Sequence, residues 1–518
     1  MNGAQALIRT LVQAGVDVCF MNPGTSEMHF VAALDDVPEM RGVLALFEGV
    51  ATGAADGYAR IANKPASVLL HLGPGLGNGL ANLHNARKGH VPVVNIVGDH
   101  ATYHKQYDAQ LESDIETVAR NVSTWIRTSN KTDELAADAA EAVAVAAGPP
   151  AQVATHILPA DVSWTEGAEP ASPHATLTPE AVDADLVARL ATILTGDEPA
   201  ALFVGGRACR ADALVQASRI TNTTGTKLLA ETFPTRVERG AGRVPVERLA
   251  YLAEFATMQL DGLKHLILVD SKSPVSFFAY PGKASDLVPE GCTVHTLAGP
   301  AGDPLAALTA LAEAVGAEAG SETIQPVSLP DLPTGDLSAD AVCRTIGALL
   351  PEGAIVSDEG NTSGLFAAGH TAGSPAHDWM CLTGGAIGQG LPVALGAAVA
   401  APDRKVIALQ ADGAAMYTLQ SWWTMARENL DVVTVIFNNS SYAVLNMELN
   451  RVGATAGGPK AKEMLDIGSP NLDFVALARG MGVSATRATT AEEFNDQFAA
   501  AVSQRGPVVI EAVVPSIL

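Results

Sequence analysis

The sequence predicts an α/β protein made of three doubly wound domains, each with a parallel sheet covered by helices on both faces. Short apolar runs alternate with helical patterns along most of the 518-residue chain, which is typical of parallel strands buried on both faces. Two segments rich in Pro, Ser, Thr and Glu, residues 165–180 and 315–335, interrupt this alternation and are interpreted as linkers. The length also fits three domains of about 150 residues each.

The first domain is expected at residues 1–165. Apolar side chains recur at helical spacing from Ala4 to Val12 and predict an opening helix. A buried strand follows at residues 16–21. The glycine-rich run GPGLGNG is interpreted as a turn that precedes a helix through residues 83–88. Further buried strands are expected at residues 67–72, 91–97 and 152–158.

The other two domains show the same alternation. The middle domain, residues 181–314, has apolar runs at 199–204 and 266–269 that predict buried strands. The third domain, residues 336–518, has comparable runs, so we expect strands at 354–357, 405–409 and 432–437.

Charge and cysteine content exclude several classes of protein. The chain has 56 acidic residues against 32 Lys and Arg, a net charge of −24, which repels nucleic-acid phosphates and anionic lipid. The five cysteines lie far apart, without the spacing of a zinc site or a disulfide framework. The N-terminus lacks the pattern of a secretory signal, so we expect a cytoplasmic protein.

One long uncharged stretch, residues 379–402, raises the question of a membrane span. It is dominated by Ala and Gly and includes Pro392, whereas a spanning helix is more apolar and less interrupted. We therefore expect no membrane segment.

Polar residues follow two strands of the third domain. Asp412 comes after the strand that includes 405–409, and Asn439 follows the strand at 432–437. Open parallel sheets bind ligands at the carboxyl ends of their strands, and carboxylate, amide and carbonyl oxygens suit Mg²⁺. The helix that begins at Gly413 and Ala414 would favour a phosphate. Taken alone, each half is better explained by an Asp-Gly turn or a polar strand end.

The stretch from Asp412 to Tyr442 resembles the thiamine-diphosphate motif of the acetolactate synthase and benzoylformate decarboxylase family, in which GDG is followed after about 25 residues by NN. Ala411 and Ala443 stand where that family usually has Gly. The resemblance covers nearly the whole chain and implies pyrimidine-binding, central and diphosphate-binding domains in that order. It implies thiamine diphosphate and Mg²⁺ as cofactors, with the metal held by Asp412, Asn439 and the Ser441 carbonyl and the cofactor contacted by Gly413, Ala414 and Tyr442.

Two further segments of the third domain match the family. GGAIGQGLP, residues 384–392, is similar to the segment that bends the cofactor. By this match Ile387 lies beneath the thiazolium ring and the Gly385 carbonyl accepts from the pyrimidine amine. The loop DEGNT, residues 358–362, is similar to a loop on the diphosphate side, which implies contacts from Asn361 and Thr362.

The first domain carries the segments that imply catalysis. FEGVATGAADGYAR, residues 47–60, is similar to the family's glutamate signature, and Glu48 stands at the position that activates the pyrimidine ring. His71 matches a histidine that transfers protons in benzoylformate decarboxylase, and Thr25 matches a serine there. An imidazole that titrates near neutral pH suits such work, although a satisfied core histidine is the alternative for His71.

The substrate end departs from the family. The second active-site histidine of benzoylformate decarboxylase would fall at Phe278 or Ala279, and no His is present there. His100 or His104, in the loop after residue 98, could supply the missing function. Glu448 stands where both family types carry an aromatic residue, so a carboxylate there could repel or orient a charged substrate.

The resemblance implies an enzyme that decarboxylates a 2-oxo acid, joins the product to an aldehyde or second 2-oxo acid, or does both, as acetolactate synthase does. We find no counterpart of the flavin segments and expect no FAD. Because family members share each active site between subunits, we expect a homodimer or homotetramer. The alternatives are a decarboxylase of the benzoylformate type, a lyase on another substrate, and a non-catalytic relative that only binds cofactor.

Overall fold

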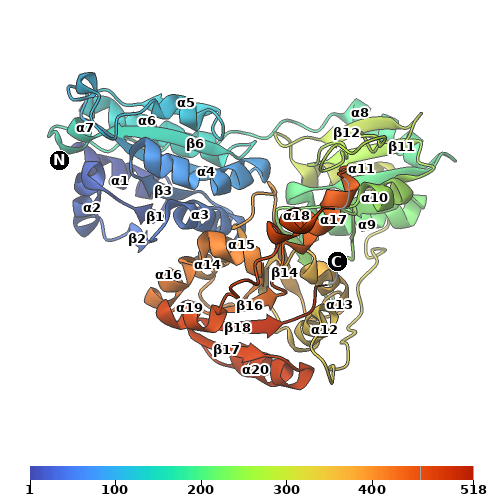
Figure 1. Cartoon of the computed structure of the whole chain (residues 1–518). Coiled ribbons are helices and arrows are strands. Elements are labelled where there is room, and N and C mark those ends of the chain that lie inside the picture. Colours follow the sequence, from blue (N-terminus) through green and yellow to red (C-terminus); the bar gives the residue numbers. More distant parts are fainter. Residues whose placement is uncertain (455–456, 517–518) are drawn as a thin grey trace.

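The computed structural model describes residues 1–454 and 457–516 and has three α/β units arranged around a common junction (Figure 1). The first unit lies beside the second, and the third lies below both of them in this view. Each unit has its own sheet. The predicted fold class is therefore confirmed, while the domain boundaries remain a proposal.

The first sheet has six parallel strands in the order β2-β1-β3-β4-β6-β5. Its strands are β1 (Val18–Asn22), β2 (Arg41–Leu44), β3 (Ala66–Leu70), β4 (Val93–Asp99), β5 (Trp125–Thr128) and β6 (Val153–Pro159). Its helices are α1 (Gly3–Gln13), α2 (Met28–Ala33), α3 (Glu48–Ala62), α4 (Leu72–Lys88), α5 (Ile115–Ala119), α6 (Thr132–Ala147) and α7 (Ala160–Trp164), with 3-10 turns η1 (Thr25–Glu27), η2 (Leu34–Asp36) and η3 (Lys105–Tyr107).

The second sheet has five parallel strands in the order β10-β8-β7-β11-β12. Its strands are β7 (Ala200–Val204), β8 (Lys227–Ala230), β10 (Glu247–Arg248), β11 (His265–Val269) and β12 (Thr293–Ala298). Around it lie α8 (Ala184–Leu194), η4 (Gly206–Cys209), α9 (Ala211–Thr224), α10 (Ala253–Leu260) and α11 (Pro304–Ala314).

The third sheet has the order β17-β18-β16-β15-β13-β14-β9, and only β9 is antiparallel to its neighbour. Its strands are β9 (Val237–Arg239), β13 (Ile355–Glu359), β14 (His377–Cys381), β15 (Val406–Ala411), β16 (Val432–Asn438), β17 (Ser484–Ala488) and β18 (Val508–Val513). Its helices are α12 (Ala339–Leu349), α13 (Ala367–His370), α14 (Gly390–Ala400), α15 (Asp412–Thr418), α16 (Ser421–Arg427), α17 (Ala443–Arg451), α18 (Pro459–Glu463), α19 (Phe474–Gly480) and α20 (Ala491–Ser503), with the turn η5 (Ser363–Phe366).

Strand β9 is an exchange between units that the sequence analysis did not anticipate. It lies in the sequence between strands of the second sheet but pairs with β14 of the third, with Arg239 opposite His377. The Arg236 side chain just before β9 donates to Asp378 of β14 at 2.6 Å. The second and third units are thus joined by backbone and side-chain pairing.

The glycine-rich run after β3 is helical, so the predicted turn at residues 73–79 is wrong. Helix α4 begins at Leu72 and contains the whole run. Pro74 fits because it lies in the first helical turn, where a backbone N–H has no intrahelical partner. A Cβ atom on Gly79 would lie 2.8 Å from the Thr52 methyl group of α3, and one on Gly73 would lie 2.0 Å from the Ser113 hydroxyl. The glycines therefore permit close packing inside a helix.

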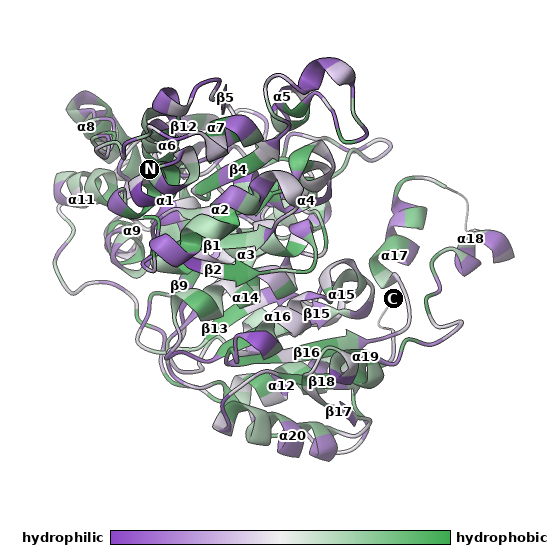
Figure 2. Ribbon diagram, turned by 90° about the vertical axis from the view of Figure 1, so that its left-hand side faces the viewer, coloured by the Kyte–Doolittle hydropathy of each residue, from purple (hydrophilic) through white to green (hydrophobic). Residues whose placement is uncertain are grey.

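Helices α3 and α14 pack along each other and join the first unit to the third. A Cβ atom on Gly396 would lie 1.8 Å from the Ala54 carbonyl oxygen, and one on Gly57 would lie 2.1 Å from the Val393 carbonyl oxygen. Both helices are therefore in backbone contact. In Figure 2 the hydrophobic colouring lies mainly in the interior of the molecule, on the strands and on α3 and α14. The hydrophilic residues lie mainly on the outer helices. No helix within the described part of the chain is long and apolar enough to cross a membrane.

Candidate functional site

Asp412 is the centre of the polar cluster in the third unit. It is buried at the first position of α15, directly after β15. Its Oδ1 accepts from the Gly413 N–H at 2.7 Å, and its Oδ2 accepts from the N–H groups of Asn439 and Ser440 at 2.9 and 2.7 Å. Burial raises the pKa of Asp412, and these N–H groups oppose the rise. No cationic side chain is among its partners in the described part of the chain, so a metal ion would supply the missing positive charge.

Asn439 and Ser441 lie on the loop between β16 and α17, next to Asp412. The Asn439 Oδ1 accepts from the Ser441 N–H at 3.0 Å and keeps a second lone pair free. Within residues 1–454 and 457–516, no hydrogen bond reaches the Ser441 carbonyl, and no three His, Cys, Asp or Glu side chains gather as metal ligands. The predicted ligand set contains only one such side chain, because its other two donors are an amide and a backbone carbonyl.

Tyr442 covers the start of α15. A Cβ atom on Gly413 would lie 2.4 Å from the Tyr442 ring, so only glycine allows this contact. Ala414 follows Gly413 in the same buried helical turn. The structure therefore brings Asp412, Gly413, Ala414, Asn439 and Tyr442 together, as the motif predicts.

The diphosphate-side loop lies after β13, the strand next to β15. Asn361 is exposed and has a left-handed backbone with φ of 47°, and Thr362 is buried. The next residue, Ser363, accepts a long hydrogen bond of 3.4 Å from the Asn439 side chain. This loop and the Asp412 cluster therefore share one edge of the third sheet.

The segment that contains Ile387 is held by a buried carboxylate that the sequence analysis did not select. Glu359, the last residue of β13, accepts from the N–H groups of Gly388 and Gly390 at 2.7 and 2.8 Å and from the Gln410 side chain at 2.7 Å. Burial raises its pKa against these donors. Gly385 has a φ of 76° and lies against the Phe277 ring, which a Cβ atom would approach within 2.5 Å. Ile387 itself is half-buried.

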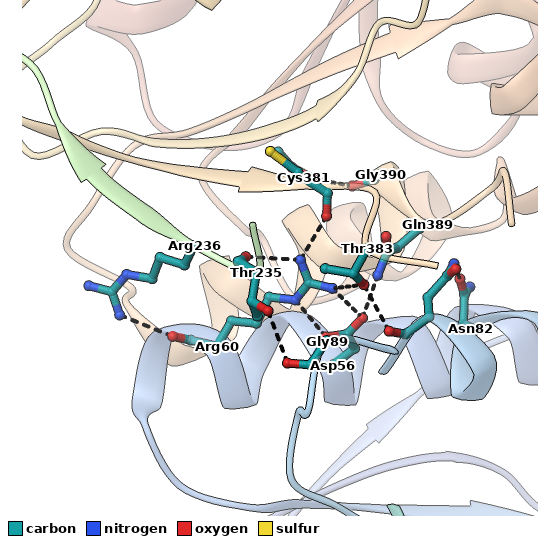
Figure 3. A network of polar contacts seen from close by, with 12 residues as sticks. Asp56, Arg60, Asn82, Gly89, Thr235, Arg236, Cys381, Thr383, Gln389 and Gly390 are labelled. Carbon is teal, nitrogen blue, oxygen red and sulfur yellow. Dashed lines mark hydrogen bonds and ion pairs between the residues drawn. The ribbon is translucent and has the colours of Figure 1, made fainter. Parts of the chain in front are cut away.

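A second set of contacts holds the same segment from the first unit (Figure 3). Asp56 and Arg60 of α3 form a fully buried ion pair, with Arg60 Nε 2.6 Å from Asp56 Oδ1. Arg60 also donates to the carbonyl of Cys381 at 2.9 Å and to the hydroxyl of Thr383 at 3.1 Å. Gln389 donates to Asp56 Oδ2 at 2.5 Å. Residues on both sides of Ile387 are therefore attached to α3.

Glu48 and His71 meet at the carboxyl edge of the first sheet. Glu48 is the first residue of α3 and is largely buried, and its Oε2 accepts from the Asn78 side chain at 3.1 Å. His71 precedes α4 directly after β3. Gly75 lies between them, because its Cβ position is 3.3 Å from Glu48 Oε1 and 3.5 Å from the His71 Cβ. The structure thus brings together two of the predicted catalytic side chains.

Thr25 and Glu27 belong to the turn η1 beside His71. Thr25 is exposed, at the first position of the turn. Glu27 is buried and its Oε2 lies 2.8 Å from His71 Nδ1. The sequence analysis did not select Glu27. The signal available was a carboxylate three residues after Gly24, in the Pro-Gly turn that follows β1.

The predicted substrate-pocket residues are not all together. Glu448 on α17 is buried, its Oε1 accepts from the Tyr251 hydroxyl at 3.4 Å, and its other oxygen has no partner among the described residues. Phe278 is 52% exposed and packs on Phe277, whose ring touches Gly385 and Tyr251. His104 lies apart from this group, in the loop after β4, with its ring 5.2 Å from that of His100.

Comparisons with known proteins agree with this geometry. Residues 1–124 match the family model described as thiamine pyrophosphate enzyme, N-terminal TPP binding domain, and residues 358–512 match its C-terminal TPP binding domain. A protein of Mycobacterium tuberculosis named provisionally as acetolactate synthase large subunit IlvX is 60% identical over the full length of both chains. The benzoylformate decarboxylase of Pseudomonas aeruginosa is 29% identical and covers 96% of each chain. A solved thiamine-diphosphate-dependent 4-hydroxybenzoylformate decarboxylase of Rhodococcus jostii has a TM-score of 0.87 at 23% identity over 99% of each chain, which supports the fold.

Proposed function

Since the chain belongs to the family of thiamine-diphosphate-dependent enzymes, we propose that it uses Mg²⁺ to bind this cofactor, removes CO₂ from a 2-oxo acid, and transfers the remaining fragment to an aldehyde or a second 2-oxo acid. The buried Asp412 cluster carries the proposal. It joins an uncompensated carboxylate, an amide oxygen and a free carbonyl at the edge of a parallel sheet.

The residues present fit the cofactor. Asp412, Asn439 and the Ser441 carbonyl would hold Mg²⁺, and the start of α15 with the loop at Asn361 and Thr362 would hold the diphosphate. The Gly385 carbonyl and Ile387 would meet the rings. Thiamine diphosphate, when bound, supplies the nucleophilic carbon and the electron sink that allow a 2-oxo acid to lose CO₂.

The side chains of the first unit would handle protons. Glu48, oriented by Asn78, would hydrogen-bond the pyrimidine ring and exchange a proton with it. His71 would give a proton to the substrate carbon or take one from it, and the exposed Thr25 hydroxyl would hydrogen-bond the substrate. Release of an aldehyde, as in a benzoylformate decarboxylase, is the second candidate, because protonation by His71 would produce that outcome.

The polar group around Glu448 supports a substrate with a polar end. Arg451 lies 3.6 Å from Glu448 Oε1 and over the Tyr280 ring, so charge and aromatic faces are combined beside Phe277 and Phe278. His104, in the loop after β4, would act only if that loop moved toward the substrate.

We expect no FAD, and an ion pair in the second unit supports this expectation. Arg207 donates to Asp270 at 3.0 Å and to the carbonyls of Pro300 and Gly302 at 2.9 and 2.8 Å. These contacts occupy the carboxyl edge of the sheet between β7 and β11, where α/β sheets bind nucleotides.

We propose that the protein forms a homodimer or homotetramer in which Glu48 of one chain serves the Asp412 cluster of a neighbouring chain. Coexpression of the Glu48→Gln and Asp412→Ala variants tests the sharing. Random twofold assembly would restore about a quarter of the wild-type activity, since half the dimers carry one intact site. Activity that stays at the level of the separate variants would refute sharing between chains.

The experiment that tests the reaction uses a panel of 2-oxo acids, alone and with aldehyde acceptors, in the presence of thiamine diphosphate and Mg²⁺. Release of CO₂ with formation of a 2-hydroxy ketone or a 2-hydroxy-2-alkyl-3-oxo acid is the expected result. Glu48→Gln should abolish turnover while cofactor binding persists. If the purified chain binds the cofactor but neither releases CO₂ nor exchanges the C2 proton of thiamine diphosphate, the chain is the non-catalytic relative.

A further inference from the structure

The Glu27 carboxylate lies against His71 and is sealed from solvent. Its side chain has no exposed surface, whereas 24% of the His71 side chain is exposed. Oε2 of Glu27 accepts from the Gly24 N–H at 2.7 Å and lies 2.8 Å from His71 Nδ1. Oε1 has no hydrogen-bond partner among residues 1–454 and 457–516. All the polar contacts of this carboxylate are thus made through the oxygen that faces the histidine.

Two glycines make room for the pair. A Cβ atom on Gly98 would lie 1.6 Å from Glu27 Oε1, and one on Gly24 would lie 2.4 Å from His71 Nδ1. The backbone of Gly24 is extended, with φ of −122°, and Gly98 lies within strand β4, so neither residue needs glycine for its conformation. These two positions therefore provide space for the Glu27 carboxylate and the His71 imidazole.

The hydrogen bonds define which nitrogen of the ring carries the proton. Oε2 is an acceptor toward the Gly24 N–H, and no other side-chain donor reaches Glu27 among the described residues, so we assign Nδ1 as the donor to the same oxygen. Neutral imidazole carries one N–H, and a proton on Nδ1 leaves Nε2 with its lone pair free. Since the exposed part of the side chain belongs to His71 and not to Glu27, Nε2 is the nitrogen that a ligand can reach.

We propose that Glu27 is a positioning residue that fixes His71 in the Nδ1–H tautomer, so that Nε2 is the atom that gives and takes the substrate proton. The inference rests on the proposed function, in which His71 handles that proton. In the protonation step the Nε2–H bond of the imidazolium breaks and a C–H bond forms at the substrate carbon that has lost CO₂. The electron pair of the new bond comes from that carbon, and the electron pair of the broken Nε2–H bond stays on Nε2, so the ring becomes neutral with its remaining proton on Nδ1.

The electrostatic surroundings of Glu27 and His71 favour a proton held between these two side chains. Burial raises the pKa of Glu27, while the His71 ring and the Gly24 N–H oppose the rise. The other titratable groups on the surrounding elements are Glu48, which is bonded to Asn78, and Asp99, which is paired with Lys105 at 2.7 Å; His100 follows Asp99 in the chain. Glu27 is therefore the carboxylate that contacts the imidazole directly.

A nitrogen-15 spectrum of the full-length protein tests the tautomer without any activity. Histidine-labelled protein is measured at about pH 8.5, two units above the usual imidazole pKa of about 6.5, and His71 is assigned from the spectrum of His71→Gln. We expect a protonated Nδ1 and an unprotonated Nε2 in the wild type, and the reverse in Glu27→Met, which keeps the side-chain length without an acceptor. The wild-type spectrum alone overturns the proposal if Nε2 carries the proton.

Activity gives a second readout once a substrate is found. Glu27→Met should lower kcat about 100-fold or more, the usual contribution of an acid–base group, and Glu27→Gln, which keeps one acceptor oxygen, should recover part of it. Exchange of the C2 proton of bound thiamine diphosphate, assigned to Glu48, should stay within about twofold of wild type. Glu116→Met, at an exposed position of α5, is the matched control. Absence of exchange in the wild type would contradict the proposed function, whereas a wild-type tautomer in Glu27→Met would contradict only the role of Glu27.

Discussion

Replacement of Asp56 by Asn tests whether the buried ion pair of α3 holds the first and third units together. Asp56 receives Nε and Nη2 of Arg60 at 2.6 and 2.8 Å and the Gln389 amide at 2.5 Å. Both side chains of the pair have no exposed surface. Asn would keep one acceptor oxygen and would present an NH₂ group to donors, which leaves the Arg60 charge uncompensated.

The expected loss of stability is large because the remaining charge is buried. Removal of one partner from a buried ion pair typically costs about 3–5 kcal/mol, because the other charge stays desolvated without a counter-ion. Arg60 keeps neutral acceptors, the carbonyls of Thr235 and Cys381 and the Thr383 hydroxyl, and these favour the lower end of that range. We therefore expect a loss of about 3 kcal/mol in the free energy of unfolding.

Urea unfolding, followed by circular dichroism and tryptophan fluorescence, measures this loss for each resolved transition. The matched control is Glu116→Gln, because Glu116 and Arg120 have the same i, i+4 spacing on α5 but are 3.9 Å apart with side chains 51% and 68% exposed. An exposed pair of this kind should contribute under about 0.5 kcal/mol. If Asp56→Asn costs no more than the control, the pair does not stabilise the junction and the reasoning fails.

Three other changes give independent tests. Burial lowers the pKa of His377 to about 4, so the folded state binds a proton at this residue less readily than the unfolded state does. The free energy of unfolding should therefore fall by about 3 kcal/mol between pH 6.5 and 4 because of this residue. His377→Gln should lack this part of the pH dependence, whereas a variant at the exposed His174, His174→Gln, should keep it. Gly396→Ala should destabilise by about 1–3 kcal/mol in thermal or urea unfolding, since its methyl would lie 1.8 Å from a carbonyl of α3, whereas Gly77→Ala, with open space around it, should stabilise α4 by up to about 1 kcal/mol. Arg451→Gln breaks the contact of α17 with the Glu254 carboxylate of α10, so hydrogen exchange should accelerate across 443–451; unchanged exchange there would show that other contacts hold α17.

The sequence was sufficient for the parts of the fold that depend on local patterns. Buried strands of parallel sheets are runs of apolar residues, so β4, β7, β15 and β16 were predicted within two residues of their bounds. Edge strands such as β9 and β10 are short and carry charged residues, and they form only because a neighbouring strand is present. Helix α4 was misassigned because glycine has a low helix propensity, whereas packing against α3 favours glycine at those positions.

The same distinction applies to the site. Asp412 and Asn439 were predicted because each follows a recognisable strand, and strands that are neighbours in a parallel sheet bring their carboxyl ends together. Glu27 and Glu359 were not selected, because their importance comes from being buried against partners 44 and 29 residues away. Spacing in the sequence does not report such contacts, since they depend on how separate loops meet at one sheet edge.

The segment around Ile387 depends on the first unit as much as on its own. Glu359 fixes Gly388 and Gly390 from inside the third sheet, while Asn85 of α4 donates to the Ala386 carbonyl at 2.8 Å and His84 contacts the Gly384 carbonyl at 3.1 Å. A small rotation of α4 would therefore move the backbone on which Ile387 is mounted. Because α4 also begins next to His71, one helix links the proposed proton donor to the proposed support of the cofactor rings. Substitutions along the α3–α4 contact should therefore change cofactor affinity and turnover together, even where the substituted residue touches neither the cofactor nor the substrate.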